Sequence, residues 1–227
     1  MRGRRFLSVS ILAACVLLSA ACQHLSATGG AVPMRQDLGD RETEVNAALA
    51  NPAHPDDPFV LVTLREALRG LRERNGGIGA CLVRESAGEI VETGHNRQYE
   101  PYFRSDLHAE MDLLDRYEER MRTRRSRDPG SPGFRDPRNM AGLVLYTSME
   151  PCPMCMARII NAGVKKVRYA VVDPTGGMAT RFDDLPPFWK GMAQGLVIEP
   201  ALCSPALQGL ARRLFRPGYG EMGAPMQ

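Results

Sequence analysis

The feature that most constrains this chain is a set of metal-ligating side chains divided between two short motifs. The first motif is His108-Ala109-Glu110 and the second is Pro151-Cys152-Pro153-Met154-Cys155. One imidazole and two thiolates are ligands that suit Zn²⁺, and three protein ligands leave the fourth tetrahedral position for water, as in catalytic zinc sites. The fold must therefore bring together two segments that lie far apart in the sequence.

Both motifs coincide with predicted helix starts. The spacing of apolar residues predicts helices over residues 107–119 and 154–162. A Cys-x-x-Cys spacing puts both sulfur atoms on one side of a helical turn, and Pro151 suits the start of that helix. The positive end of a helix also favours thiolate over thiol. We therefore expect His108 and Glu110 in the first turn of one helix and both cysteines at the start of another.

Glu110 indicates which reaction such a site supports. Two residues after the histidine, it cannot easily ligate the same metal from a helix, but it can stand beside the water and move protons. Zinc lowers the pKa of water from about 15.7 to near neutrality. Hydroxide would then add to an amidine-like carbon, Glu110 would pass the proton to a ring nitrogen, and ammonia would leave. Hydrolytic deamination needs no cofactor besides Zn²⁺.

Other interpretations use only part of this pattern. A Cys-x-x-Cys pair on a helix is also typical of structural zinc or of a redox dithiol. A redox dithiol leaves His108 and Glu110 unexplained and would carry no stoichiometric zinc. A silent, zinc-stabilised envelope lipoprotein is a further alternative, although the intact Glu110 argues against it.

With these residues in place, the chain resembles the cytidine deaminase-like superfamily, especially the branch of tRNA-adenosine, guanine and fungal-type cytosine deaminases. The resemblance covers residues 59–182. It is carried by Gly94-His95-Asn96, His108-Ala109-Glu110, Ser148-Met149-Glu150-Pro151-Cys152-Pro153-Met154-Cys155, Ala162-Gly163-Val164, and Val167-Arg168-Tyr169-Ala170 leading to Asp173. It implies that His108, Cys152 and Cys155 bind zinc, that Glu110 is the proton shuttle, and that the protein forms a homodimer.

The resemblance also implies substrate contacts. It places Asn96 where an amide hydrogen-bonds the base, Ala109 beside the substrate, and Asp173 in a segment that builds part of the pocket. Asn96 could instead cap its own hairpin, and Asp173 could belong only to a turn. Trp189, in the Pro-rich segment 185–189, could stack on a planar substrate as a lid, but plain packing is slightly favoured.

The order of predicted elements indicates an α/β fold, a three-layer α-β-α sandwich with a mixed five-stranded sheet. The predicted helices cover residues 41–51, 59–75, 107–119 and 154–162, with a last helix capped by Ser204 and ending at Phe215. The predicted strands cover residues 78–84, 89–95, 143–147, 165–172 and 196–199.

The N-terminal residues predict export. A basic start precedes the apolar stretch 6–18, which is short for a membrane span. Small residues before Cys22 resemble a lipoprotein cleavage box. We therefore expect a signal peptide over residues 1–21, lipid on Cys22, and a location in a bacterial envelope, periplasmic or associated with the outer membrane. Cys15 stays open as the alternative lipidated cysteine. A tether with a short helix would cover residues 22–55, and the zinc deaminase domain residues 56–227.

The net charge of the chain limits the classes of partner that we expect. The formal net charge is +3, and the three arginines of residues 1–21 account for all of it. A neutral body without an aromatic and basic stripe makes nucleic acid an unlikely partner and favours a free base, nucleoside or related aminoheterocycle as substrate. The polar insert over residues 121–140 carries several arginines, for which a solvated linker is the plainer interpretation and phosphate contact the alternative. We expect Cys81 and Cys203 to be buried free thiols, and a disulfide between them is the alternative.

Overall fold

The computed structural model describes residues 34–128, 130 and 140–220, and the chain divides into two units, residues 1–36 and 37–227. The predicted signal peptide, Cys22 and the predicted tether up to residue 33 lie outside the described residues. Within the described part, no helix is both long and apolar enough to cross a membrane.

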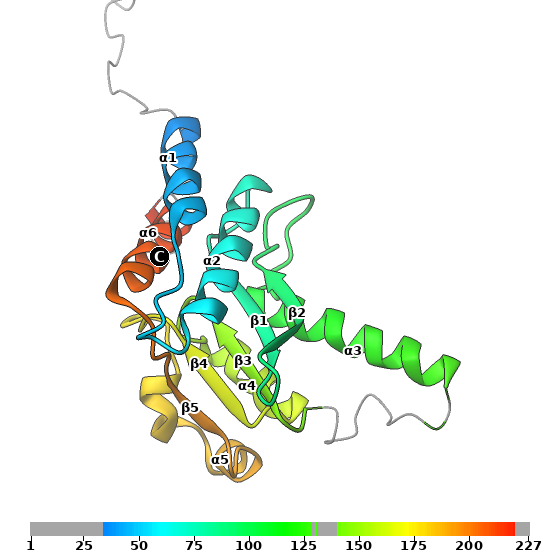
Figure 1. Ribbon diagram of the computed structural model, residues 1–227. Coiled ribbons are helices and arrows are strands. Elements are labelled where there is room, and N and C mark those ends of the chain that lie inside the picture. The colour runs from blue at the N-terminus through cyan, green and yellow to red at the C-terminus, as the bar shows by residue number, and fades with distance from the viewer. Residues whose placement is uncertain (1–33, 129, 131–139, 221–227) are drawn as a thin grey trace, which may run out of the picture. The chain divides into compact units, whose positions relative to one another are not determined.

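A mixed five-stranded sheet organises this unit (Figure 1). Its spatial order is β2-β1-β3-β4-β5, with β1 antiparallel to both β2 and β3, and with β3, β4 and β5 mutually parallel. The strands are β1 (Gly79–Arg84), β2 (Glu89–His95), β3 (Leu143–Thr147), β4 (Lys166–Tyr169) and β5 (Val197–Pro200). The predicted mixed sheet is therefore confirmed.

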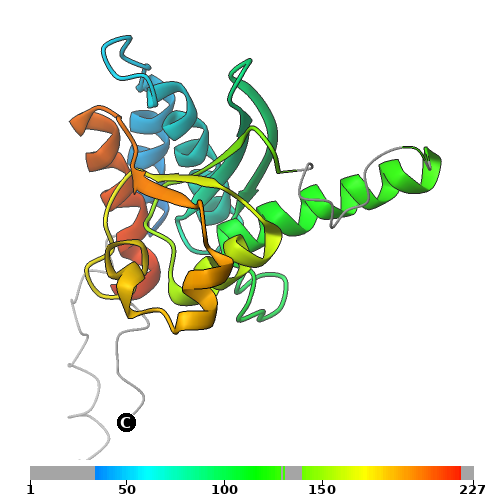
Figure 2. The ribbon, with the colours of Figure 1, turned by 90° about the horizontal axis from the view of Figure 1, so that it is seen from below.

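Helices cover both faces of the sheet, which Figure 2 shows from below. On one face lie α1 (Met34–Ala47), α2 (Asp57–Arg72) and α6 (Pro205–Gly220), and on the other lie α3 (Ala109–Arg127) and α4 (Pro153–Ala162). Side chains of β1 alternate between the two layers: Ala80 and Leu82 pack toward α3, while Cys81 and Val83 pack toward α2. This double burial explains why the strand reads as a continuous apolar run.

Several boundaries differ from the sequence prediction. Helix α3 continues through Arg127, so the first part of the predicted insert is helical, because its arginines and glutamates are good helix formers. Strand β4 ends at Tyr169, where its pairing with the short β5 ends. The structure adds a 3₁₀ segment (Ala179–Asp184) and α5 (Pro187–Met192), both too short to show a periodic pattern.

The four cysteines in the described part of the chain are free thiols. Cys81 packs with Phe59 and Tyr146, whereas Cys203 packs in the separate core formed by α1, α2 and α6. The expectation of buried free thiols is confirmed, and the alternative Cys81–Cys203 disulfide is wrong.

Gly94 sets the distance between β2 and α3. A Cβ atom at this position would lie 2.6 Å from the backbone nitrogen of Leu113 and 2.8 Å from the carbonyl oxygen of Ala109. Both neighbours are helix backbone and cannot rotate away. The strand end before Asn96 therefore lies directly against the first turns of α3, which carry the metal motif.

We predict that Gly94→Ala lowers the free energy of unfolding by about 1–3 kcal/mol, because the new methyl group must push α3 from the sheet. Urea denaturation measures this change. The matched control is Gly191→Ala in α5, where an added Cβ meets nothing within 4 Å, so its effect should stay within about 0.5 kcal/mol. Equal stabilities for the two variants would contradict the close approach of β2 and α3.

Candidate active site

Two helix N-termini supply the predicted metal ligands. His108 and Cys152 each occupy the residue just before a helix, α3 and α4 respectively, with extended backbone angles of −69°, 166° and −72°, 170°. Glu110 and Cys155 follow within the first turns. The positive end of α4 therefore meets both thiolates, as the sequence predicts. His108 precedes α3, whereas the sequence placed it in the first turn, because its extended backbone angles lie outside the helix.

The three ligand atoms have the separations that zinc requires. His108 Nδ1 lies 3.6 Å from Cys152 Sγ and 3.5 Å from Cys155 Sγ, and all three ligand atoms lie within 4.8 Å of one another. Zinc bonds of about 2.3 Å to sulfur and 2.0–2.1 Å to nitrogen, at a tetrahedral angle, imply a sulfur–nitrogen separation of about 3.6 Å. The residues fit Zn²⁺ with three protein ligands.

Glu110 stands beside this group and is buried. Its Oε1 accepts a hydrogen bond of 3.1 Å from the Thr147 hydroxyl at the end of β3, and its Oε2 lies 3.4 Å from Cys155 Sγ. Burial, followed by the negative charge of Cys152, raises the pKa of Glu110. Thr147 is a site residue that sequence reasoning missed, because a threonine at the end of a strand carries no signature.

Contacts among the three ligand side chains shift their pKa values. A hydrogen bond from the Cys155 thiol, aided by His108 and opposed by burial, lowers the pKa of Cys152 to about 4. The same hydrogen bond, together with burial, raises the pKa of Cys155 well above its usual value. Burial lowers the pKa of His108, but contact with the Cys152 thiolate outweighs it and raises that pKa overall. One thiolate thus exists before the metal arrives.

We predict that zinc binding releases protons near neutral pH and that zinc affinity rises with pH. Bound zinc needs a Cys155 thiolate and a neutral His108, and the raised pKa values of both groups favour their protonated forms, so zinc competes with protons for these two ligands. Titration calorimetry in buffers of different ionisation enthalpy counts the released protons. Cys203→Ser, a change in the separate core, should leave that count unchanged. A binding enthalpy independent of the buffer would contradict this protonation state.

A buried carboxylate, Glu150, shapes the chain around the ligands and was also missed from sequence. Its Oε2 accepts 3.0 Å from the Asp173 backbone nitrogen, and its Oε1 accepts 2.7 Å from the Thr180 nitrogen and 2.9 Å from the Thr180 hydroxyl. A Cβ at Gly177 would lie 2.3 Å from the Glu150 carboxyl carbon, so only glycine fits there. Glu150 thereby fastens residues 173–180 to the segment that leads into Cys152.

The predicted substrate residue Asp173 is engaged within its own turn. Its Oδ1 accepts hydrogen bonds of 2.9–3.0 Å from the Thr175 nitrogen, the Thr175 hydroxyl and the Gly176 nitrogen. This geometry is the turn that sequence reasoning kept as the alternative. Substrate contact by Asp173 stays a prediction.

Ala109 follows His108 directly, and a backbone hydrogen bond links the residue after Asn96 to the residue before His108. The backbone nitrogen of Arg97, next to Asn96, donates 2.9 Å to the carbonyl of Leu107, next to His108. The Asn96 side chain is buried and closes a turn by accepting 3.0 Å from the Gln98 nitrogen. The Ala109 methyl group packs in the core, so its free contact with a substrate would be its backbone N–H in the first turn of α3. The substrate roles of both residues stay predictions.

Trp189 packs beside α4, the helix that begins after Cys152. In α5 it contacts a small core that includes Met156 and Ile160 of α4, and its ring meets Phe188 edge-on at 5.8 Å. Phe188 is exposed. This arrangement agrees with the packing interpretation, while a lid function of Trp189 stays a prediction.

Comparison with known proteins identifies the region that carries the site. Residues 54–171 match the family profile described as the cytidine and deoxycytidylate deaminase zinc-binding region. The chain is 32% identical over 122 residues to a tRNA-specific adenosine deaminase of Bacillus subtilis strain 168, covering 54% of this chain and 65% of that protein. It is 30% identical over 128 residues to the tRNA-specific adenosine deaminase of Aquifex aeolicus strain VF5, covering 56% and 74%.

Solved structures share the fold. A tRNA:A34 deaminase structure from work on A-to-I editing at the wobble position superposes with a TM-score of 0.50 at 24% identity, covering 69% of this chain and 98% of that one. A guanine deaminase from Nitrosomonas europaea has a TM-score of 0.50 at 21% identity, covering 76% and 90%. At these identities the two structures support the fold alone.

Proposed function

Because this chain belongs to the family of the cytidine and deoxycytidylate deaminase zinc-binding region, and is thereby a zinc-dependent deaminase, we propose that it removes the exocyclic amine of a nucleobase, nucleoside or related aminoheterocycle by hydrolysis. The net reaction replaces the amine on a ring carbon with oxygen from water and releases ammonia. The single observation that carries the proposal is the buried Glu110 fixed by Thr147 beside His108, Cys152 and Cys155.

Zinc, Thr147 and Glu110 have different roles in this reaction. When bound, zinc supplies the Lewis acidity that makes an attacking water acidic near neutral pH. The Thr147 hydroxyl occupies Oε1 of Glu110, which leaves Oε2, on the side of the ligands, to take the proton. Glu110 then delivers that proton to a ring nitrogen, takes the second proton of the added water, and gives it to the departing amine.

Binding and orientation of the ring are proposed for Asn96 and for the first turn of α3. Asn96 offers an amide that can both donate to and accept from the edge of a base. The backbone N–H of Ala109 can donate to the substrate, since the first turn of a helix has no intrahelical partner for its N–H groups. Burial of Glu110 excludes bulk water from the proton path.

We predict that the zinc-loaded protein releases ammonia from a member of a panel of aminopurines, aminopyrimidines, their nucleosides and aminopterins. Glu110→Gln should lower kcat/KM at least about 10²–10⁴-fold while one zinc per chain is retained, because the proton shuttle is lost but the ligands stay. The matched control is Glu119→Gln on the exposed face of the same helix, which should keep full activity. Unchanged turnover in Glu110→Gln would exclude this mechanism.

A nucleic acid is the second candidate substrate, and two observations favour it. The two bacterial relatives described above are tRNA-specific adenosine deaminases. The final turns of α3, which extend away from the sheet in Figure 1, carry Arg122, Arg124, Arg125 and Arg127 with exposed side chains. tRNA and single-stranded oligonucleotides therefore belong in the same panel. Binding that weakens steeply with salt, and less steeply after replacement of these arginines by glutamine, would favour this candidate.

We also infer an exported, lipid-anchored homodimer from the N-terminal motif and from the family resemblance. A lipid on Cys22 would place the domain in the envelope, where free bases and nucleosides are the available substrates. We predict that the mature protein begins at Cys22 and carries acyl chains, which intact mass spectrometry of the membrane fraction detects. Cys22→Ser should abolish the acylation, whereas Cys15→Ser should preserve it. A mature protein that retains residues 1–21 without lipid would contradict the anchor.

A further inference from the structure

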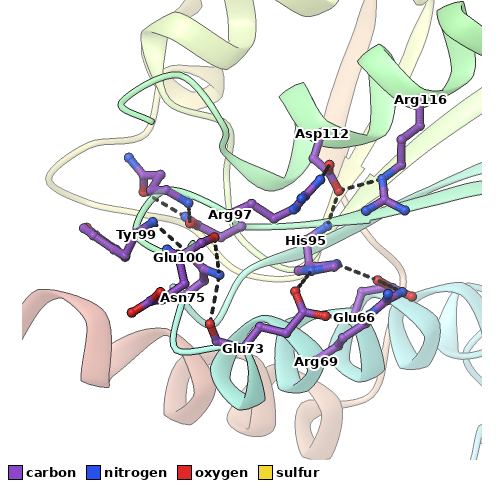
Figure 3. A network of polar contacts seen from close by, with 12 residues as sticks. Glu66, Arg69, Glu73, Asn75, His95, Arg97, Tyr99, Glu100, Asp112 and Arg116 are labelled. Atoms are coloured by element: carbon purple, nitrogen blue, oxygen red, sulfur yellow. Dashed lines mark hydrogen bonds and ion pairs between the residues drawn. The ribbon is translucent and has the colours of Figure 1, made fainter. Parts of the chain in front are cut away.

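A buried histidine, His95, joins the sheet to α2 at the residue that precedes Asn96 (Figure 3). It is the last residue of β2, and only 1% of its side chain is exposed. Its Nδ1 lies 3.0 Å from Glu66 Oε2 and its Nε2 lies 2.9 Å from Glu73 Oε2. Glu66 lies in α2 and Glu73 follows the last residue of this helix, so the imidazole ring spans the last two turns of α2.

The imidazole ring lies between two carboxylates, one at each of its nitrogens. Burial raises the pKa of Glu66 and of Glu73, but the hydrogen bonds and charge of His95 lower both overall, so both groups are carboxylates. Arg69 adds a second cation, 3.1 Å from Glu73 and 4.0 Å from Glu66. The ring and the Arg69 guanidinium thus lie between the same two carboxylates.

The backbone of the same residue is tied to α3. The His95 nitrogen donates 3.2 Å to Oδ2 of Asp112, which is buried. Asp112 belongs to the first turns of α3, where its own nitrogen donates 2.9 Å to the His108 carbonyl, and it also pairs with Arg97 at 3.3 Å. His95 therefore holds the end of β2 against both the helix of the metal motif and α2.

Asn96 is the residue that this double attachment positions. Its nitrogen donates 3.0 Å to the Ile78 carbonyl, and the next residue, Arg97, donates to Leu107 beside His108. Side chain and backbone of His95 thus fix the chain on one side of Asn96, and the Arg97–Leu107 bond fixes it on the other. An amide that must meet a ring edge needs such a fixed backbone, because small displacements are costly in oriented sites.

We propose that His95 is a positioning residue for the deamination reaction: its ion pairs with Glu66 and Glu73 hold Asn96 in the place where it binds the substrate ring. The inference rests on the proposed function, in which Asn96 contacts the base. A purely stabilising ion-pair cluster would instead affect unfolding without acting through Asn96.

The test is a double-mutant cycle on the zinc-loaded full chain, with the panel compound that the wild-type protein deaminates. In His95→Gln, the amide presents its NH2 group on one side and its carbonyl oxygen on the other, so one of the two carboxylates faces an acceptor. We expect KM to rise about tenfold with a smaller change in kcat, because contact with the ring is lost in the ground state and transition state alike. In the Asn96→Ala background, His95→Gln should change kcat/KM less than about twofold.

The outcomes separate this inference from the proposed function. An equal loss from His95→Gln in both backgrounds, or no loss from it in either, overturns the positioning role while deamination stands. Unchanged activity in Asn96→Ala overturns the assigned role of Asn96, and with it the inference. The activity of Glu110→Gln tests the deamination mechanism independently of His95.

Two further variants distinguish a loss of positioning from misfolding of the protein. His95→Gln with Glu73→Gln rebuilds the donor set, since the amide nitrogen of the second glutamine can donate to the carbonyl oxygen of the first. Glu73 is 43% exposed and tolerates the change, so we expect KM to return toward the wild-type value. The matched stability control is Tyr146→Phe, which removes a buried 2.7 Å hydrogen bond to Asp56 in another part of the core and should lower Tm without changing KM.

Amide hydrogen exchange gives a readout that needs no substrate. The Arg97 and Gln98 nitrogens donate to Leu107 and to the Asn96 side chain. Their exchange should accelerate in His95→Gln and recover in the double variant with Glu73→Gln. Exchange at these amides that is the same as in the wild-type protein would overturn the inference.

Discussion

Two helix N-termini that meet at one point are the constraint on which the rest of this structure depends. Helices α3 and α4 begin directly after His108 and Cys152, and the ligand atoms of these two residues lie 3.6 Å apart. The arrangement brings two helix N-termini, a thiolate and an imidazole together at a site where His108 and Cys152 are half-buried and Cys155 is buried. Such a group is costly without a cation or protons to balance it. Zinc binding and the packing of both helices on one face of the sheet are therefore coupled.

Buried carboxylates connect the ligand group to the backbone segments around it. Glu110 joins the end of β3 to the ligands through Thr147, and Glu150 fastens the chain after β4 to the entrance of α4. Asp112 ties the end of β2 to the first turns of α3. Each of these side chains is buried and hydrogen-bonded, so each holds a backbone segment in one place. The ligand group is thus surrounded by segments with little freedom to move.

The sequence was informative wherever chemistry or periodicity is local. The Cys-x-x-Cys spacing, the His108 motif and the apolar run of β1 predict the ligands and the doubly covered sheet, and the structure confirms the sheet and brings the ligands together. The His95–Glu66–Glu73 cluster could not be predicted, because it depends on how the end of β2 meets one face of α2. The hydroxyl of Thr147 reaches Glu110 only through the pairing of β3, which no single segment encodes. The extension of α3 was missed because a charged sequence resembles a linker until helix propensity is considered.

Zinc K-edge X-ray absorption of the purified full chain distinguishes an open zinc site from a closed one. We predict stoichiometric zinc with two sulfur neighbours at about 2.3 Å and two nitrogen or oxygen neighbours at about 2.0–2.1 Å, one from His108 and one from water. Cys155→Ser should remove one sulfur from that shell. A four-sulfur shell, or a protein that takes up no stoichiometric zinc, would contradict the account.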